Sequence, residues 1–177
     1  NDRCDGRRVR SVNGMQRFMP FIMKDRCDAQ NTYSDNFDIT KTEKYCRDKV
    51  KAGLTNFSIL HVLLASYVRT VSQRPGINRF ISGQEIYSRY EIEVVMTVKK
   101  TMSLDSADTC IKVVFEPTDT IDDIYRKFNM VVEKSIGPNA DTDFDNFANA
   151  FKKIPRWLFR FAVWFLNKLD YHRMLPK

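Results

Sequence analysis

The stretch RPGINRFISGQEIYSRYEIEVVMTVKK, residues 74–100, decides the fold class of this chain. Pro75-Gly76 ends the apolar segment before it, and Ser82-Gly83-Gln84 is typical of a tight turn between the short runs INRFI and EIYSR. These features predict a β-hairpin. Beyond it, apolar residues alternate with polar ones at the period of two expected for a strand: Ile92, Val94, Met96 and Val98. Val95, on the other side of that strand, predicts a sheet that is partly covered on both faces.

The segments that follow predict a second strand and further helices. Residues 109–116, TCIKVVFE, repeat the alternation and are the expected antiparallel partner of the first strand. Thr120 and Asp123 predict the start of a helix that ends at Gly137-Pro138. A short helix carrying Phe144, Phe147 and Phe151 and a terminal helix from Pro155 are expected to complete the chain.

The segments before the hairpin are predicted to be mainly helical. Residues 57–73 carry apolar side chains on nearly every side of the helical wheel, which predicts a central, buried helix. Thr40 and Glu43 form the pattern of a capping box that begins a helix over residues 41–52. The segment before it, AQNTYSDNFDIT, has residues that favour a strand. Residues 15–26 predict a short amphipathic segment bent at Pro20.

Residues 1–14 are polar and basic and are expected to form an N-terminal arm, with one domain over residues 15–177. Alternating helical and strand patterns predict an α/β fold. We expect helices packed against a mixed, mainly antiparallel sheet.

Composition limits the classes of protein to which the chain can belong. Of its 177 residues 43% are hydrophobic, which excludes a chain disordered throughout. No run of 18 apolar residues and no signal-peptide pattern is present, so a cytoplasmic protein with free thiols is expected. The four cysteines lack metal-ligand spacing, and no metal site is predicted.

The formal net charge of +7 leaves several partners open. Arg7, Arg8 and Arg10 form one basic cluster, but the remaining charge is dispersed, so no nucleic-acid partner is predicted. An ordinary solvated surface, or attraction to an anionic cofactor such as coenzyme A, explains the charge as well.

The two histidines belong to no catalytic motif. His61 lies within the apolar segment SILHVLLAS, where a buried histidine satisfied by a hydrogen bond is the simpler interpretation. His172 lies in DYHRML, where a surface or helix-terminus role is expected. Without further information the residues predict an α/β domain with an aromatic C-terminal helix.

That helix has two interpretations. Its apolar side chains form a broad surface that includes Trp157, Phe161 and Trp164, with Arg156, Arg160 and Lys168 beside it. The set is typical of an interfacial membrane helix. A helix in the core or at a subunit contact explains the same pattern, and the many Phe residues elsewhere in the chain favour this second interpretation.

Four segments, together with the predicted helix over residues 41–52 that lies between the first two, resemble in their order the superfamily of chloramphenicol acetyltransferase and the dihydrolipoyl acyltransferase catalytic domains of 2-oxo acid dehydrogenases. They are DAQNTYSDNFDIT (28–40), NFSILHVLLASYVRTVSQRPGINRF (56–80), ISGQEIYSRYEI (81–92) and EVVMTV (93–98). The nearest likeness is to stand-alone bacterial acyltransferase-like proteins. The resemblance implies a two-layer sandwich, a homotrimer with active sites between subunits, and acyl transfer between coenzyme A and a small-molecule acceptor. A histidine would deprotonate the acceptor hydroxyl or thiol, and a nearby hydroxyl would stabilise the oxyanion.

The chain departs from that family at its catalytic motif, H-x-x-x-D-G. The only Asp-Gly pair is Asp5-Gly6, and neither His61 nor His172 fits the motif, so no catalytic residue is expected in this chain. The last strands and the catalytic segment of the fold are expected to be missing. The chain is then the N-terminal portion of an enzyme, or a short relative that serves as a non-catalytic binding or assembly module.

Four positions correspond by resemblance to site residues of the family. Tyr33 matches an aromatic residue of the acceptor pocket, and Asn78 and Arg79 fall in the turn near the acceptor channel. Arg17 matches an arginine that braces the motif aspartate. The same four residues would be present if the tyrosine lay in the core, the arginines on the surface and the asparagine in a turn, with no role in a site.

Overall fold

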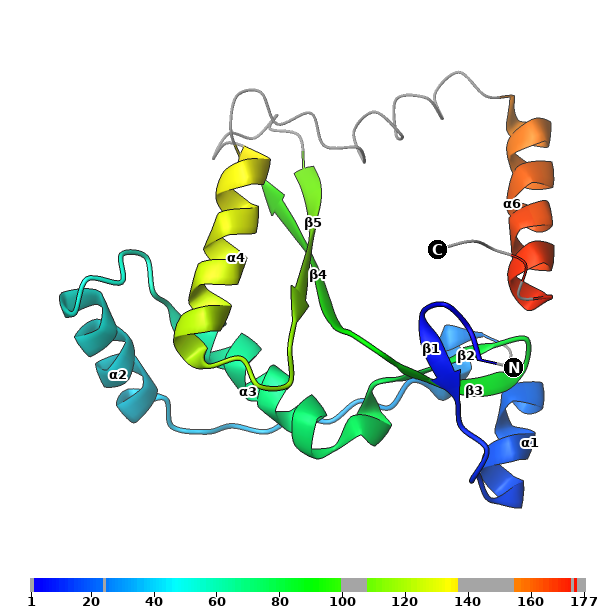
Figure 1. The fold of residues 1–177 in the computed structure, drawn as a ribbon, viewed down its shortest axis with the longest axis horizontal. Helices are drawn as coiled ribbons and strands as arrows, with labels where there is room; N and C mark the ends of the chain where they lie inside the picture. The colour runs from blue at the N-terminus through cyan, green and yellow to red at the C-terminus, as the bar shows by residue number, and fades with distance from the viewer. Residues whose placement is uncertain (1, 24, 100–107, 137–154, 173, 175–177) are drawn as a thin grey trace. The chain divides into compact units, whose positions relative to one another are not determined.

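The computed structural model describes residues 2–23, 25–99, 108–136, 155–172 and 174, and shows a mixed α/β chain (Figure 1). The chain divides into two compact units, Asn1–Tyr90 and Glu91–Lys177. One domain was predicted over residues 15–177, whereas the structure divides the chain between the hairpin and the strand that follows it. Each unit is described separately below.

The sheet of the first unit has three strands: β1 (Gly6–Arg8), β2 (Arg79–Ser82) and β3 (Glu85–Arg89). The order is β1-β3-β2, and both pairings are antiparallel. The predicted hairpin is confirmed as β2 and β3. Its two turn residues, Gly83 and Gln84, have φ of 56° and 60°, and positive φ at both central positions is the mark of a type I′ turn.

The basic N-terminal segment is part of this sheet and not the free arm that its composition predicted. Gly6 to Arg8 pair with Arg89 to Tyr87. A side chain at Gly6 would not fit, because an added Cβ would lie 2.7 Å from Phe80 Cε1 and 2.9 Å from the Ser88 carbonyl oxygen. Glycine therefore allows the first strand to approach β3 closely.

The helical elements of the first unit are α1 (Gly14–Ile22), η1 (Arg26–Ala29), α2 (Thr40–Lys51), α3 (Ile59–Gln73) and η2 (Pro75–Ile77). The predicted strand before α2 is wrong, because residues 30–39 have no regular structure. Tyr33 and Phe37 are exposed there. β-favouring residues form a strand only where another strand supplies hydrogen bonds, and no described strand pairs with this segment.

Two predicted features of the helices also need correction. The buried side chains of α3 are confined to His61, Leu64, Val68 and Val71, so the helix is amphipathic and not buried on all sides. The start of α2 is not capped by Thr40 and Glu43. The Asp38 carboxylate instead accepts hydrogen bonds from the Thr40 N–H (2.8 Å) and the Thr40 hydroxyl (2.5 Å).

The second unit contains the antiparallel pair β4 (Ile92–Lys99) and β5 (Asp108–Phe115), with α4 (Ile121–Ile136) packed against β5 (Figure 1). The predicted strand pairing is confirmed. The core of the second unit consists of Ile92, Ile111, Val113, Phe115, Ile124 and Phe128. Val95 and Val114 are exposed, so the described residues do not provide the predicted cover on the second face of this sheet. The described strands thus form two small antiparallel sheets in place of one mixed sheet.

The predicted start of α4 is confirmed. Thr120 and Asp123 form a reciprocal cap, in which the Thr120 N–H donates to the Asp123 carboxylate (3.1 Å) and the Asp123 N–H donates to the Thr120 hydroxyl (3.3 Å). The last described helix is α6 (Arg156–Tyr171), which begins after Pro155 as predicted. The predicted short helix with Phe144, Phe147 and Phe151 lies outside the described residues. None of the described helices has the length and apolar character required to cross a bilayer.

Candidate functional site

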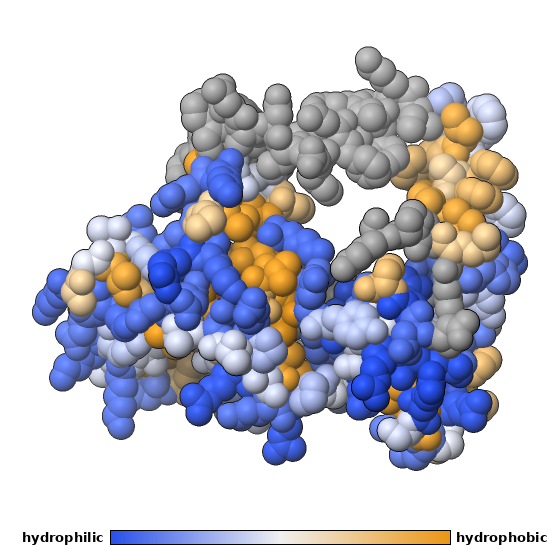
Figure 2. Space-filling model, in the orientation of Figure 1, coloured by the Kyte–Doolittle hydropathy of each residue, from blue (hydrophilic) through white to orange (hydrophobic). Residues whose placement is uncertain are grey.

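The first unit carries all of the net positive charge of the chain. Residues 1–90 contain 16 Lys and Arg against 9 Asp and Glu, a formal charge of +7, whereas residues 91–177 contain 13 of each kind. In the view of Figure 2 the surface near β1 is mostly hydrophilic, whereas α1 also exposes Met15, Phe18, Phe21 and Ile22. An anionic partner would therefore be drawn to the first unit.

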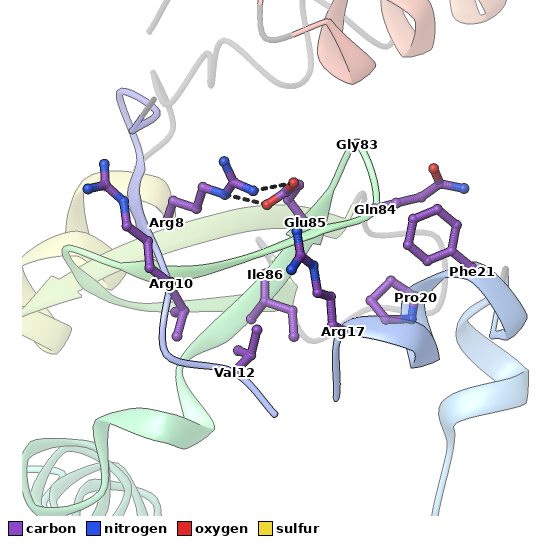
Figure 3. A pocket seen from close by; sticks show the side chains of 11 residues that line it. Arg8, Arg10, Val12, Arg17, Pro20, Phe21, Gly83, Gln84, Glu85 and Ile86 are labelled. Atoms are coloured by element: carbon purple, nitrogen blue, oxygen red, sulfur yellow. Dashed lines mark hydrogen bonds and ion pairs between the residues drawn. The ribbon is translucent and has the colours of Figure 1, made fainter. Parts of the chain in front are cut away.

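A pocket of about 310 Å³ lies in this unit, between α1, the chain that leaves β1, and the β2–β3 turn (Figure 3). We call it the arginine pocket. Its lining residues are Arg8, Val9, Arg10, Val12, Arg17, Pro20, Phe21, Gly83, Gln84, Glu85 and Ile86. Three of them are arginines and one is an acid, so the lining has a formal charge of +2.

The arginines of the pocket differ in their surroundings. Arg8 is ion-paired with Glu85 (Figure 3), and the two side chains are 29% and 30% exposed. Arg10 and Arg17 are exposed, and within the described residues neither guanidinium has an ion pair or a side-chain hydrogen bond. A guanidinium binds carboxylate or phosphate oxygens through two parallel hydrogen bonds. Arg10 and Arg17 are thus the groups of this pocket that are available to an anion.

A second hollow, of about 840 Å³, shares three residues with the arginine pocket. It is lined by Asp2, Arg7, Arg8, Val9, Arg10, Ser11, Ser88, Arg89 and Tyr90. The segment 8–10 therefore lies between two hollows that both contain arginines. A ligand with more than one anionic group could contact both sides of this segment.

Arg3, by contrast, has a structural role. Its guanidinium donates to the Asp5 carboxylate (2.9 Å) and to the Ser82 hydroxyl (2.6 Å), and it lies 5.6 Å from the centre of the Phe80 ring. Burial by itself raises the pKa of Asp5, but the hydrogen bond and charge of Arg3 outweigh it and hold that pKa below its ordinary value. Arg3 thereby fixes the N-terminal segment to the hairpin that forms one wall of the arginine pocket.

Three of the four site residues expected by resemblance lie around this sheet. Arg17 extends from α1 and lines the arginine pocket. Arg79 lines a smaller groove of about 300 Å³ beside α1, with Gln16, Met19, Pro20, Phe80, Ile81 and Ile86. Asn78 shapes the start of the hairpin, since its carbonyl accepts from the Arg89 N–H (3.0 Å).

The fourth residue, Tyr33, is not brought to this place. Its side chain is 86% exposed, its hydroxyl lies 3.5 Å from an Asp35 carboxylate oxygen, and it lines neither hollow nor the small groove. Sequence reasoning missed Arg10 and Glu85 as site residues. The basic cluster that contains Arg10 was visible, but it was assigned to an arm.

His61 has the structural role that was the simpler interpretation. It is 3% exposed, stacks on Phe57 with the ring centres 5.2 Å apart, and accepts the Ser58 N–H at Nδ1 (3.1 Å). It thus closes the N-terminal turn of α3 in the position that Glu or Gln takes in a capping box. His172 is exposed at the C-terminal end of α6, as expected. His61 does not line the arginine pocket, which lies in the same unit.

The described residues contain no group of three or more His, Cys, Asp or Glu that could hold a metal ion. Cys4, Cys27, Cys46 and Cys110 are free thiols, as predicted. Comparisons with protein-family models, with curated proteins and with solved structures found no match. The arginine pocket therefore has to be interpreted from its own chemistry.

Proposed function

We propose that this chain forms part of a coenzyme A-dependent acyltransferase of the chloramphenicol acetyltransferase-like superfamily, and that the arginine pocket binds phosphate groups of coenzyme A. The single observation that carries the proposal is the pair of exposed guanidiniums, Arg10 and Arg17, on a pocket with a lining charge of +2. The family in this proposal is supported by the order of the segments that resemble the superfamily.

The positive charge of this region and its two adjoining hollows support coenzyme A as the proposed ligand. It carries a 3′-phosphate and a diphosphate, both remote from the thioester, and charge-assisted hydrogen bonds to phosphate oxygens are among the strong polar contacts of proteins. The second hollow, with Arg7 and Arg89, provides room for a ligand longer than the arginine pocket alone. Binding energy at the phosphates would position the thioester without taking part in the chemical step.

The chemical step would be attack of an acceptor hydroxyl or thiol on the thioester carbonyl. The acceptor proton passes to a general base, the tetrahedral oxyanion collapses, and the coenzyme A thiolate leaves. His61 is committed to the cap of α3, and His172 follows the last turn of α6. We therefore assign no catalytic residue among those described. The base would come from a further segment, in a homotrimer of the kind found in the family.

A non-catalytic binding module of the same fold is the second candidate. The specific observation in its favour is that His61, the histidine of the first unit, is committed to the cap of α3 and does not line the arginine pocket. Such a module would bind coenzyme A and transfer no acyl group.

Titration calorimetry of the chain with coenzyme A, 3′-dephospho-coenzyme A and pantetheine tests the proposal. We expect coenzyme A to bind most tightly, 3′-dephospho-coenzyme A more weakly, and pantetheine most weakly. Added salt should weaken the binding of the two phosphate-containing ligands. Arg17→Ala and Arg10→Ala should each weaken coenzyme A binding about tenfold, a loss of about 1.4 kcal/mol. Arg69→Ala, an exposed arginine on α3 outside both hollows, is the matched control.

A folded chain that binds no coenzyme A at millimolar concentration would overturn the proposal. So would pantetheine binding as tightly as coenzyme A, since phosphate contacts would then contribute nothing. Release of free coenzyme A from acetyl-coenzyme A in the presence of small alcohols and thiols tests whether the chain has a base, and turnover by the chain alone would contradict the absence of one. Binding without turnover is expected for both candidates. Turnover that appears when a segment carrying H-x-x-x-D-G is supplied would favour the acyltransferase, and no turnover with that segment would favour the module.

A further inference from the structure

The helix α6 presents an apolar surface that no described residue of its own unit buries. It contains no buried residue, and Trp157 and Trp164 are 72% and 59% exposed. The helix α4 has the same length of 16 residues, yet it buries Ile124 and Phe128. Figure 2 shows apolar residues spread over the surface of α6. Amphipathic helices of globular domains bury such a face, so the apolar face of α6 is a candidate surface for binding a partner.

The positions of its charges indicate what that partner is. At 100° per residue, Arg156, Arg160, Asn167 and Asp170 fall on one side of α6 together with Val163, and the remaining arc is apolar except for Lys168. Trp157 and Trp164 lie at one border of this arc, next to Lys168 and close to Arg160. Tryptophan at the border of a cationic and an apolar face is typical of helices that lie in the headgroup region of a bilayer.

We propose that α6 is an interfacial helix that docks this protein on the surface of an anionic phospholipid bilayer. Its apolar arc would be buried among the upper acyl chains, while Arg156, Arg160 and Lys168 contact lipid phosphates. The three cations against Asp170 give the helix a formal charge of +2. A helix of 16 residues is about 24 Å long, shorter than the hydrocarbon core is thick, so it lies in the plane of the membrane.

Charge favours a bilayer over a second copy of the chain. A symmetric contact between two copies of α6 would bring the same cationic border residues together, and Asp170 is the only acid that the helix offers in return. An anionic lipid surface neutralises all three cations at once. This proposal is independent of the coenzyme A site.

The two tryptophans of the chain are both on α6, so intrinsic fluorescence reports on this helix directly. The chain is titrated with phosphatidylcholine vesicles and with vesicles that contain phosphatidylglycerol as well. We expect the emission to shift to shorter wavelength with the anionic vesicles and to be quenched by brominated acyl chains. The chain should also co-sediment with these vesicles, and far less with phosphatidylcholine alone.

Variants separate the apolar and the electrostatic parts of the interaction. The double variant Arg160→Glu, Lys168→Glu should weaken anionic-vesicle binding by about tenfold or more. Trp164→Glu should weaken binding to a similar degree, with Trp157 left as the reporter. Met130→Glu is the matched control, because Met130 is an exposed apolar residue on α4. Circular dichroism establishes that each variant is folded, and a variant that is not folded is replaced by Trp164→Ser or by Arg160→Gln, Lys168→Gln.

An emission spectrum that does not change with any vesicle would overturn the proposal. A spectrum already shifted to shorter wavelength without lipid, together with a dimer in analytical ultracentrifugation that Trp164→Glu dissociates, would assign the face to a second copy instead. Binding that is equal for neutral and anionic vesicles would also count against it, because the cationic border would then have no role.

Discussion

The Arg8 guanidinium and the Glu85 carboxylate form an ion pair that joins the neighbouring strands β1 and β3 across 77 positions of sequence. The pair holds the segment that carries Arg10 beside the β2–β3 turn, and it forms part of the wall of the arginine pocket. Ion pairs that are partly shielded from solvent contribute more than fully exposed ones. Arg8 and Glu85 therefore connect the stability of the small sheet with the shape of the proposed site.

A double-mutant cycle of Arg8→Ala and Glu85→Ala should give a coupling free energy of about 0.5–1 kcal/mol in urea unfolding. The value is modest because both side chains remain about 30% exposed, at 29% and 30%. The Arg47–Glu43 pair on α2, at 3.6 Å and with side chains 63% and 53% exposed, is the control and should couple by less, about 0.3 kcal/mol. A coupling no larger than that of the control would show that the first pair does not hold β1 in place.

Gly6→Ala should destabilise the first unit by about 1–3 kcal/mol. The added methyl group would meet Phe80 and the backbone oxygen of Ser88 at contacts of 2.7 and 2.9 Å, and a backbone atom cannot rotate away. Gly14→Ala at the first position of α1 is the matched control, because no atom lies within 4 Å of an added Cβ there. It should be neutral or stabilise α1 by about 0.5 kcal/mol. Equal effects of the two substitutions in thermal unfolding would contradict the close approach of β1 and β3.

The stability of the second unit should decrease at acid pH through Asp123. Hydrogen bonds from Thr120, aided by the Arg126 charge, hold the pKa of Asp123 below its ordinary value of 3.8. A carboxyl group whose pKa is lowered on folding stabilises the fold fully above the unfolded value, and that contribution is lost as the pH falls through the folded value. Unfolding midpoints measured from about pH 2 to pH 7 should therefore fall less steeply below about pH 4 in Asp123→Asn than in the unmodified chain.

Thr120→Ala tests the stated cause of that shift, because it removes the hydroxyl hydrogen bond to the Asp123 carboxylate while the acid remains. Its profile should be flattened in the same pH range. A profile identical to that of the unmodified chain would mean that the threonine hydroxyl does not stabilise α4 through the ionised carboxylate.

His61→Ala should destabilise the first unit by about 2–3 kcal/mol, since it removes a cap of α3 and leaves a cavity beside Phe57. His61→Gln should cost about half as much, because a serine followed three residues later by a glutamine is itself a capping-box sequence. Urea unfolding measures both. If glutamine were no better than alanine, the hydrogen bond from the Ser58 N–H would not be the reason for the histidine.

Local structure was largely predictable, and the arginine pocket was not. The hairpin, the β4–β5 pair and the starts of α4 and α6 were all correctly predicted, because turn residues, caps and periodicity act over a few positions. The strand predicted at residues 30–39 was wrong, because strand-favouring residues form a strand only where a partner strand from elsewhere in the chain pairs with them. Arg17 was predicted as a site residue only through the family resemblance. Arg10 was recognised as part of a basic cluster, but it was not assigned to a site.

Local residue patterns were enough to predict the α/β class of the chain, the ends of several helices and the turn between β2 and β3. They were also enough to place His61 in the interior, because its neighbours in the helix are apolar. The strand formed by Gly6 to Arg8, and the pocket shared by Arg10 and Arg17, became apparent in the folded structure alone. The difference follows from distance along the chain. Caps and turns are satisfied within a few residues, whereas a pocket depends on which remote segments hydrogen-bond and pack together.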